Sequence, residues 1–473
     1  MGYARARSVV VDGVTGRLVT VEADISPGLS AVFGSREQGD RVRAAILNSG
    51  YGWPDARVTL PCESSESITD LAVAVALLAA DGCLPVERLD GVVLLGELSL
   101  DGRLRPVRGI VPAVSAAGTS TVIVPAGCAD EAAAVPGAVV VPAVRLSEVL
   151  ERLRDGTLTP HIRAALRAAS QLDLSDVPGN HAARFALEVC AAGGHHLFMV
   201  GDGPGLMLAE RLPGILPPLD DAAALEVEAV YSVAGQYDRA PGRTPPMSAP
   251  HHTTTLAGIT GNRHRPGALS LAHRGVLHLH EAPEFNRRIL DALPGPMDSG
   301  EVRLLGRERL VHYPARFQLV LSAATCPCGR DCTCTAMVRR RYLERLARPL
   351  EHVELRARFE RSSPAAGPGE PSAVVAARVR EARERAAVRL AGTPWRANAE
   401  VPVRLLRRYL PAVPEVIALL DVSVSAGLIT ATTVPQLVRV TWTLADLRGA
   451  SQPTEEDAAR AMELWQGARD ASR

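Results

Sequence analysis

Short apolar runs rich in β-branched residues alternate with amphipathic stretches over the first third of the chain. The apolar runs include SVVVDGV, RLVTVEADI, GVVLLGEL, STVIVPA and AVVVPA, and helical patterns such as RVRAAILNSG and DLAVAVALLAADG lie between them. Strands that alternate with helices in this way are typical of an α/β unit. The pattern predicts a first α/β domain over residues 1–153.

The same alternation predicts a second α/β unit over residues 170–360. Its strand-like runs include HLFMV, GVLHLH and FQLVLSAA, and each is followed by turn-forming or polar residues. Ligand sites in parallel sheets lie beyond the carboxyl ends of the strands. We therefore expect the chemistry of this unit at these three strand ends.

The rest of the chain has the pattern of a linker followed by helices. Residues 361–372, RSSPAAGPGEPS, are rich in proline, glycine and serine, as linkers are. Residues 373–473 form a helical domain, in which Glu381 precedes Arg385 by one turn and Thr454 precedes an acidic run as a capping residue does. Pro435 falls in one of the helical patterns and would cost about 3 kcal/mol inside a helix.

Charge and composition exclude some classes of function. The 52 basic side chains balance 52 acidic ones, and all of the basic ones are arginine, because the chain has no lysine. Net charge therefore gives no sign of a nucleic-acid or membrane partner. No apolar segment reaches the roughly 20 residues that span a bilayer, and the first residues lack a signal-peptide core, so we expect a cytoplasmic protein.

A glycine-rich turn follows the first of the three strand ends. Gly201, Gly203 and Gly205 lie between the run HLFMV and a helix-like stretch that starts at Leu206. This is the layout of a phosphate-binding loop, but the lysine that reaches the β- and γ-phosphates is missing. Arg211 lies more than a turn into the helix and does not replace it. The glycines and the helix start could still hold an anion weakly, so the stretch is either an unusual ATP site or the remains of one.

Four of the eight cysteines form one compact cluster after the third strand end. Their spacing is C-x-C-x3-C-x-C, and their thiolates are soft ligands that suit tetrahedral zinc. A structural metal and a reducible loop remain alternatives for this cluster, which is made of Cys326, Cys328, Cys332 and Cys334. The other four cysteines have the character of small buried residues and are Cys62, Cys83, Cys128 and Cys190.

Several segments together resemble one protein family. In order along nearly the whole chain they are GDRVRAAILNSG, LLGELSLDGRLRPVRGIVPA, ALEVCAAGGHHLFMVG, ERLPGILPPL, APHHTTT, RPGALSLAHRGVLHLHEAPEF, YPARFQLVLSA and CPCG. The resemblance is to the bacterial Mg-chelatase-like AAA+ proteins, the family of ComM and YifB. It implies an α/β fold with an N-terminal domain similar to the Lon protease, a central AAA+ parallel sheet of the P-loop type with helices, a C-terminal helical lid, and a ring-shaped assembly that uses ATP and Mg²⁺.

The resemblance also implies nucleotide-site residues, and several are replaced here. The loop is about two residues shorter than the family's GPPGTGKT, so that Leu206 stands where a Mg²⁺-binding hydroxyl belongs. The Walker B pair reads His280-Glu281: the glutamate that polarises water is kept, whereas a histidine replaces the metal-positioning aspartate. A neutral imidazole brings no negative charge to Mg²⁺. His278 and His280 share one strand face, so a transition-metal site made of His278, His280 and Glu281 is the alternative to simple loss of function.

Further family positions are replaced in the same way. Thr325 stands at the sensor asparagine, and His352 lies nearest the position of the arginine finger. Loss of such a finger alone costs about 10³ to 10⁵ in rate. In the lid motif Arg439 is kept, but three usual arginine positions hold other residues, namely Thr432, Gln436 and Trp442.

Together these replacements predict a family member with a degenerate nucleotide site, acting as a scaffold or regulator that assembles with itself or with an active paralogue. One alternative is an ATP-driven motor on branched DNA in competence or recombination, with neighbouring subunits supplying the missing groups. Another is a metal-binding module. Proteolysis by a serine–lysine dyad is excluded by the absence of lysine, and the arginine-rich stretches from Val338 and from Arg378 are more typical of solvated helix faces than of a DNA surface.

Overall fold

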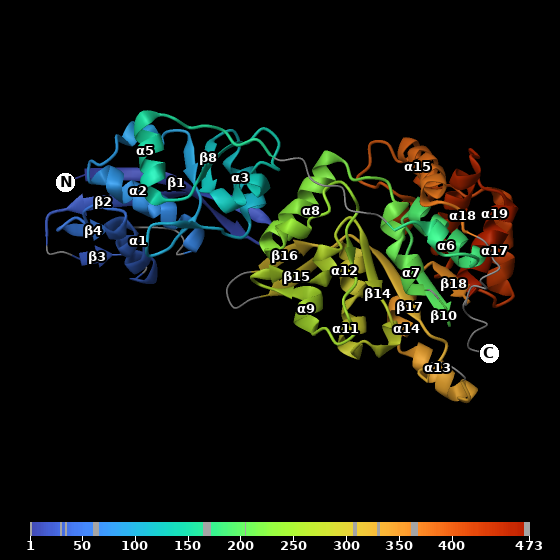
Figure 1. The fold of residues 1–473 in the computed structure, drawn as a ribbon. Coiled ribbons are helices and arrows are strands. Elements are labelled where there is room, and N and C mark those ends of the chain that lie inside the picture. The colour runs from blue at the N-terminus through green and yellow to red at the C-terminus, as the bar shows by residue number, and fades with distance from the viewer. Residues whose placement is uncertain are drawn as a thin grey trace.

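The computed structural model describes residues 2–28, 31–33, 36–59, 66–163, 172–203, 205–305, 310–328, 332–360 and 368–467. An N-terminal α/β part, a central α/β part and a group of C-terminal helices follow one another along the chain (Figure 1). This mixed architecture, with a parallel central sheet, confirms the predicted fold class. The predicted start of the second domain and most of the predicted linker fall on residues 164–171 and 361–367, which lie outside the described residues.

The N-terminal part is built on a seven-stranded sheet in the order β3-β4-β2-β1-β5-β8-β9. β1 and β2 form a long antiparallel hairpin, whereas β1, β5, β8 and β9 run parallel. α2 is apolar on all sides after its first residue, and the whole helix is buried, as expected of a helix enclosed by a core. The strands are β1 (Gly2–Asp12), β2 (Thr15–Ser26), β3 (Ala31–Phe33), β4 (Arg57–Thr59), β5 (Val92–Leu94), β8 (Thr121–Pro125) and β9 (Val139–Ala143), and the helices are α1 (Arg36–Asn48), α2 (Asp70–Ala80), α3 (Ile110–Ala117), α4 (Ala129–Ala132) and α5 (Leu146–Asp155).

The central part holds a five-stranded parallel sheet in the order β11-β14-β17-β10-β18. Because the strands are parallel, all their carboxyl ends lie at one edge, here named the carboxyl edge, and all their amino ends at the opposite amino edge. The strands are β10 (Leu197–Gly201), β11 (Met247–Ser248), β14 (Val276–Leu279), β17 (Gln318–Ala323) and β18 (Leu355–Phe359). β10, β14 and β17 confirm the three strands predicted from HLFMV, GVLHLH and FQLVLSAA.

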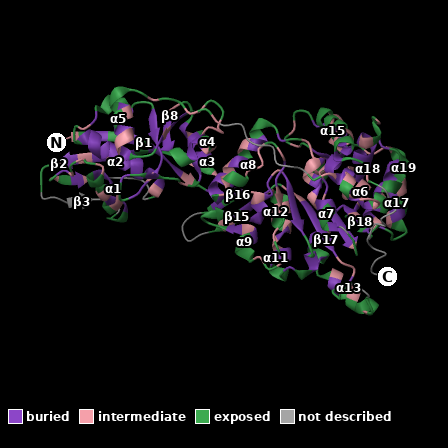
Figure 2. Cartoon of the chain, viewed as in Figure 1, coloured by how far each residue is buried: buried purple, intermediate pink, exposed green. Residues whose placement is uncertain are grey.

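Short helices and a hairpin surround this sheet. The helices are α6 (His181–Gly193), α7 (Gly205–Glu210), α8 (Asp221–Ala234), α9 (Leu256–Thr260), α10 (Ala268–Leu271), α11 (Arg287–Ala292), α12 (Pro294–Ser299), α13 (Ala336–Glu344) and α14 (Ala347–Leu350), and the hairpin is β15 (Glu301–Leu305) with β16 (Leu310–Pro314). Buried residues concentrate on the strands and on the inner faces of the helices (Figure 2). Among the described residues, no helix combines the length and the apolar character that crossing a membrane requires.

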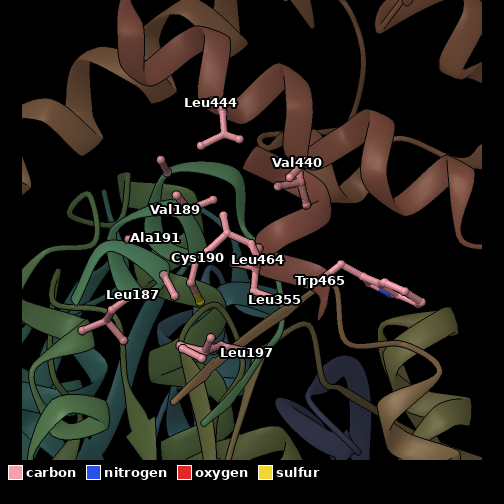
Figure 3. Close-up of a cluster of buried hydrophobic side chains, with 14 of the residues drawn as sticks. Leu187, Val189, Cys190, Ala191, Leu197, Leu355, Val440, Leu444, Leu464 and Trp465 are labelled. Carbon is pink, nitrogen blue, oxygen red and sulfur yellow. The ribbon is translucent and has the colours of Figure 1, made fainter. Parts of the chain in front are cut away.

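The C-terminal helices share one hydrophobic core with the central sheet. Side chains of α18 and α19 gather with those of α6, β10 and β18 in a single cluster, and Figure 3 shows Val440, Leu444 and Leu464 together with Leu197 and Leu355. The helices are α15 (Ser372–Arg389), α16 (Leu406–Tyr409), α17 (Pro414–Ser425), α18 (Val434–Arg448) and α19 (Glu455–Gln466). They therefore belong to the same packed unit as the sheet.

Polar side chains at the amino edge strengthen this junction. The buried Asp446 carboxylate of α18 accepts hydrogen bonds from Arg389 of α15, at 2.6 and 2.9 Å, and from the Asn398 amide at 2.9 Å. His195, which precedes β10, lies 2.8 Å from the Thr443 hydroxyl of α18. The Asp446 carboxylate thus joins C-terminal helices to one another, and the contact of His195 with Thr443 crosses the boundary between sheet and helices.

Two predictions for the C-terminal helices are confirmed, and a third is corrected. Thr454 caps α19 through a reciprocal capping box with Asp457, and Arg385 pairs with Glu381 at 3.3 Å along α15. Pro435 is only the second residue of α18. A proline in the first turn removes no helical hydrogen bond, so the predicted cost of an interior proline does not arise.

Two helices join the N-terminal and central parts. α3 lies against α8, where the N–H groups of Gly109 and Val111 donate to the carbonyl and hydroxyl of Ser232 at 3.2 and 3.1 Å. Nearby, the half-buried Glu131 of α4 faces two acidic residues of the central part. Its burial, together with the charges of Asp238 and Glu228, raises the pKa of the Glu131 carboxyl to about 7.

Candidate nucleotide site

The predicted site residues from three strand ends meet at the carboxyl edge. The glycine-rich loop follows β10, His280 and Glu281 follow β14, and Thr325 follows β17. These strands are neighbours in the sheet order β14-β17-β10. The sheet therefore brings together the loop, the Walker B pair and the sensor position, as a nucleotide site requires.

The glycines of the loop are needed for packing against the last strand. A Cβ on Gly201 would lie 1.8 Å from the carbonyl oxygen of Phe359, at the end of β18, and a Cβ on Gly205 would lie 2.6 Å from its ring. Gly203 is exposed, and its carbonyl accepts the Gly205 N–H at 3.0 Å. That donor is thus satisfied within the loop. Two of the three glycines are explained by Phe359 without any phosphate.

An acidic side chain lies in the glycine-rich loop. Asp202 is exposed, and its carboxylate accepts a hydrogen bond of 3.3 Å from the Thr325 hydroxyl. The two residues are 123 positions apart, so the contact depends on the pairing of β10 with β17. The loop therefore carries a negative charge and no lysine.

No basic side chain of the following helix is directed at the loop's phosphate position. Arg211 is buried, and its guanidinium donates to the Asp173 carbonyl at 2.6 Å, to the Met207 carbonyl at 2.8 Å and to the Asp176 carboxylate at 2.9 Å. All three of its nitrogens have partners, so it is not available for phosphate. Leu206, at the expected hydroxyl position, is exposed and offers only an aliphatic side chain.

His278 of β14 and His280, which directly follows this strand, share a serine on the neighbouring strand β17. The Ser322 hydroxyl lies 2.9 Å from His278 Nε2 and 3.0 Å from His280 Nδ1. Burial lowers the pKa of His278 to about 3, so this imidazole is neutral. Its Nδ1 is buried without a partner, which favours the proton on Nε2, donated to Ser322, because an unpaired acceptor is less costly than an unpaired donor. Ser322 then donates to His280.

The retained Walker B glutamate is exposed at the surface of the candidate site. Glu281 is exposed, has a backbone φ of 53° and lies 3.7 Å from His252 Nε2 through its carboxylate. A positive φ is strained for a residue other than glycine. The ring of His252 contacts Phe285 edge-on, with 6.4 Å between ring centroids. Sequence reasoning missed Asp202, Ser322 and His252 as members of this site.

Two predicted site residues lie away from the loop. His352 precedes β18 and is 3.8 Å from the Asp298 carboxylate of α12. Arg439 donates from Nε and Nη2 to the Val401 carbonyl at 3.0 and 2.8 Å, and burial lowers the pKa of its guanidinium beside Glu354, which also precedes β18. Both residues are therefore at the amino edge, and their sensor and finger roles remain predictions.

The residues that replace arginine in the lid motif have structural contacts of their own. Trp442 is buried, lies over the Arg389 guanidinium at 4.2 Å and donates its indole N–H to the Pro411 carbonyl at 3.1 Å. Gln436 donates to the Glu351 carbonyl at 2.7 Å, whereas Thr432 is exposed. These contacts serve packing between the helices and the sheet.

The arginine-rich helix α15 has internal partners as well. Arg378 forms ion pairs with Glu188 at 2.6 Å and Glu370 at 2.7 Å, and Arg383 donates to the Ala191 carbonyl at 2.9 Å. These side chains hold α15 to α6. They are not arranged as an open surface for a phosphate backbone.

The cysteine cluster lies directly beyond Thr325. Cys326 is buried, and the thiols of Cys328, Cys332 and Cys334 come close to it. Although desolvation opposes the change, hydrogen bonds from the Cys328 backbone and from the other thiols lower the pKa of Cys326 to about 7. Of the remaining cysteines, Cys128 and Cys190 are buried and Cys83 is half-buried, while Cys62 is outside the described residues.

Three family profiles match consecutive parts of this chain. The profile described as Magnesium chelatase, subunit ChlI matches residues 173–366, and that described as Subunit ChlI of Mg-chelatase matches residues 21–127. The profile of the Magnesium chelatase, subunit ChlI C-terminal region matches residues 369–464. The matches therefore take in both sheets and the C-terminal helices.

Similar proteins cover most or all of the chain. An uncharacterized protein of Mycobacterium tuberculosis is 43% identical over 503 positions, which take in 99% of this chain and 100% of the relative. YifB of Escherichia coli is 39% identical over 79% of this chain and 80% of its own length. The competence protein ComM of Haemophilus influenzae is 34% identical over 73% of each chain. The chain therefore belongs to the Mg-chelatase-like family that includes YifB and ComM.

Proposed function

We propose that this protein is a Mg-chelatase-family AAA+ protein that does not hydrolyse ATP, and that it acts as a scaffold or regulator by assembling with itself or with an active paralogue. The observation that carries the proposal is the Asp202 carboxylate, held in the loop by Thr325. The loop carries an acidic side chain and lacks the lysine that the family's mechanism uses.

The size of the electrostatic effect supports this proposal. Two unit charges about 4 Å apart interact by about 4 kcal/mol at the effective dielectric constant of a protein surface. A carboxylate beside the triphosphate repels it on this scale, and the attraction of the missing lysine is lost on the same scale. Each 1.4 kcal/mol is tenfold in affinity, so the two changes together outweigh what a few backbone N–H groups contribute.

The described residues also do not fit the magnesium ion of an ATP complex. Mg²⁺ prefers carboxylate, phosphate and water oxygens. The family's hydroxyl position holds Leu206, and the metal-positioning aspartate is replaced by His280, whose Nδ1 is bound to Ser322. We derive no hydrolytic step for such a site. The retained fold and its surfaces are what remain for a scaffold to use.

Calorimetric titration of ATP into the full chain, with and without Mg²⁺, tests the proposal together with a phosphate-release assay. We expect no magnesium-dependent heat and no turnover above that of a Glu281→Gln variant. An Asp202→Ala variant should bind inorganic phosphate at least tenfold more tightly than the parent, while Asp221→Ala, on α8, serves as a matched control. Turnover that Glu281→Gln abolishes would overturn the proposal.

A second candidate function is an ATP-driven motor on branched DNA. It is favoured by the exposed Glu281 carboxylate, which is kept at the site mouth beside His252. ATPase activity that arises only after mixing with an active paralogue and branched DNA, and that Glu281→Gln removes, would support the motor over the scaffold.

A further inference from the structure

The four clustered cysteines lie on a short connection between β17 and α13. Their sulfur atoms all lie within 4.8 Å of one another, and those of Cys326 and Cys328 are 3.2 Å apart. Cys326 is buried, whereas Cys328 and Cys332 are exposed and Cys334 is half-buried. The sulfurs therefore gather around one point that is closed on the protein side.

This geometry matches a tetrahedral metal site better than a disulfide. Zinc–sulfur bonds of about 2.3 Å place the four sulfurs of a tetrahedral site about 3.8 Å apart. A disulfide needs about 2.05 Å between its sulfurs, and the separation of Cys326 and Cys328 is well beyond this. Among the described residues, no other group of three or more histidine, cysteine or acidic side chains brings its ligand atoms together in this way.

We propose that Cys326, Cys328, Cys332 and Cys334 bind one zinc ion through four thiolates, and that the ion fixes the turn between β17 and α13. This proposal is independent of whether the loop binds nucleotide. Of the two alternatives that the cysteine spacing left open, it favours the structural metal.

The ion would secure structure on both sides of the cluster. On one side Cys326 follows Thr325, whose hydroxyl donates to Asp202, so a fixed Cys326 also holds this contact. On the other side α13 begins two residues after Cys334 and buries only Tyr342 among its residues. The helix protrudes from the body of the molecule (Figure 1), and with so little core contact its direction depends on how its first turn is anchored.

Zinc analysis of the full chain tests the ligand set. The protein is purified without a histidine tag under reducing conditions, and its zinc is measured by mass spectrometry of the element and by release to a coloured chelator. We expect one zinc ion per chain, at least tenfold less in a Cys328→Ser/Cys334→Ser variant, and no loss in the matched control Cys83→Ser. A parent protein without zinc that takes up none when zinc is added would overturn the proposal, as would an equal loss in the control.

Two further measurements remain informative even if the double variant folds poorly. When the parent protein is purified without reductant, thiol titration under denaturing conditions should find all eight cysteines as thiols, and a shortfall of two or four would establish a disulfide instead. Removal of zinc from the folded parent should speed trypsin cleavage at Arg339, Arg340 and Arg341 at least tenfold, with circular dichroism unchanged. Equal cleavage rates with and without zinc would contradict the anchoring of α13.

Discussion

The amino and carboxyl edges of the central sheet differ in what holds their polar side chains in place. At the amino edge, Asp446 of α18 and Arg389 of α15 form an ion pair between two C-terminal helices whose apolar side chains belong to the core. At the carboxyl edge, Asp202 and Glu281 are exposed at the ends of their strands. Replacing a residue at the amino edge therefore disturbs packing, whereas replacing one at the carboxyl edge mainly affects the binding of a ligand. A family member can therefore lose the chemistry of one edge and retain the fold through the other.

The two edges should differ most in how far a substitution lowers the free energy of unfolding. Asp446→Ala leaves the Arg389 guanidinium without its buried carboxylate and should lower the free energy of unfolding by about 3–5 kcal/mol. Glu281→Ala, at the exposed edge, should change it by less than about 0.5 kcal/mol. Urea denaturation of both variants measures the two values. Similar losses in both would mean that the edges are not distinct.

The packing role of the loop glycines gives the next largest effect. Gly205→Ala places a methyl group against the Phe359 ring and should lower the free energy of unfolding by about 2–3 kcal/mol. Gly203→Ala, at an exposed position of the same loop, should have a much smaller effect. The same denaturation assay without any nucleotide compares them, and equal effects would refute the role assigned to Phe359.

The junction between the N-terminal and central parts supplies a pH-dependent effect. The pKa of Glu131 is raised from 4.5 to about 7 in the folded protein, so between these values the folded state holds a proton that the unfolded state has released. The stabilisation is complete below pH 4.5 and is lost as the pH rises through 7.

We expect the parent protein to lose about 2–3 kcal/mol more than Glu131→Gln between pH 5 and pH 8. Thermal unfolding at both pH values measures this difference. Parallel pH profiles for the parent and the variant would show that Glu131 ionises normally.

The smallest effect concerns the strained backbone of Glu281. Glycine tolerates a positive φ, so Glu281→Gly should raise the free energy of unfolding by about 0.5 kcal/mol. Glu281→Ala removes the same carboxylate but keeps the strain, and should give no such gain. If both variants gain equally, repulsion from the carboxylate rather than the backbone angle is the cause.

Three strands of the central sheet, β10, β14 and β17, could be predicted because each lies in a mainly apolar run followed by turn-forming or polar residues, whereas arginines interrupt β18 and β11 has only two residues. The start of β1 could not be predicted from the sequence. Its first residues alternate small Ala4 and Ala6, which face the core, with Arg5 and Arg7, which face outward, and alanine gives a weak signal for a strand. The prediction therefore began at Ser8, whereas the strand begins at Gly2.

The candidate site could be predicted only where the residues of a feature lie together in one stretch of sequence. The glycine loop and the Walker B pair are local patterns. The contacts of Asp202 with Thr325 and of Ser322 with two histidines join residues from different strands, and their pairing appears only once the order of the sheet is known. For the same reason the motifs of His352 and Arg439 did not reveal at which edge of the sheet these residues lie.

The fit of Phe359 against Gly201 and Gly205 bears on how such sequences are interpreted. An aromatic side chain at the end of a strand demands small residues beside it, whatever the adjoining turn binds. Motif searches that weigh glycine spacing will thus also detect chains that keep this packing but do not bind a phosphate. Searches based on the lysine and the Ser/Thr position of the loop would distinguish family members that hydrolyse ATP from those that do not.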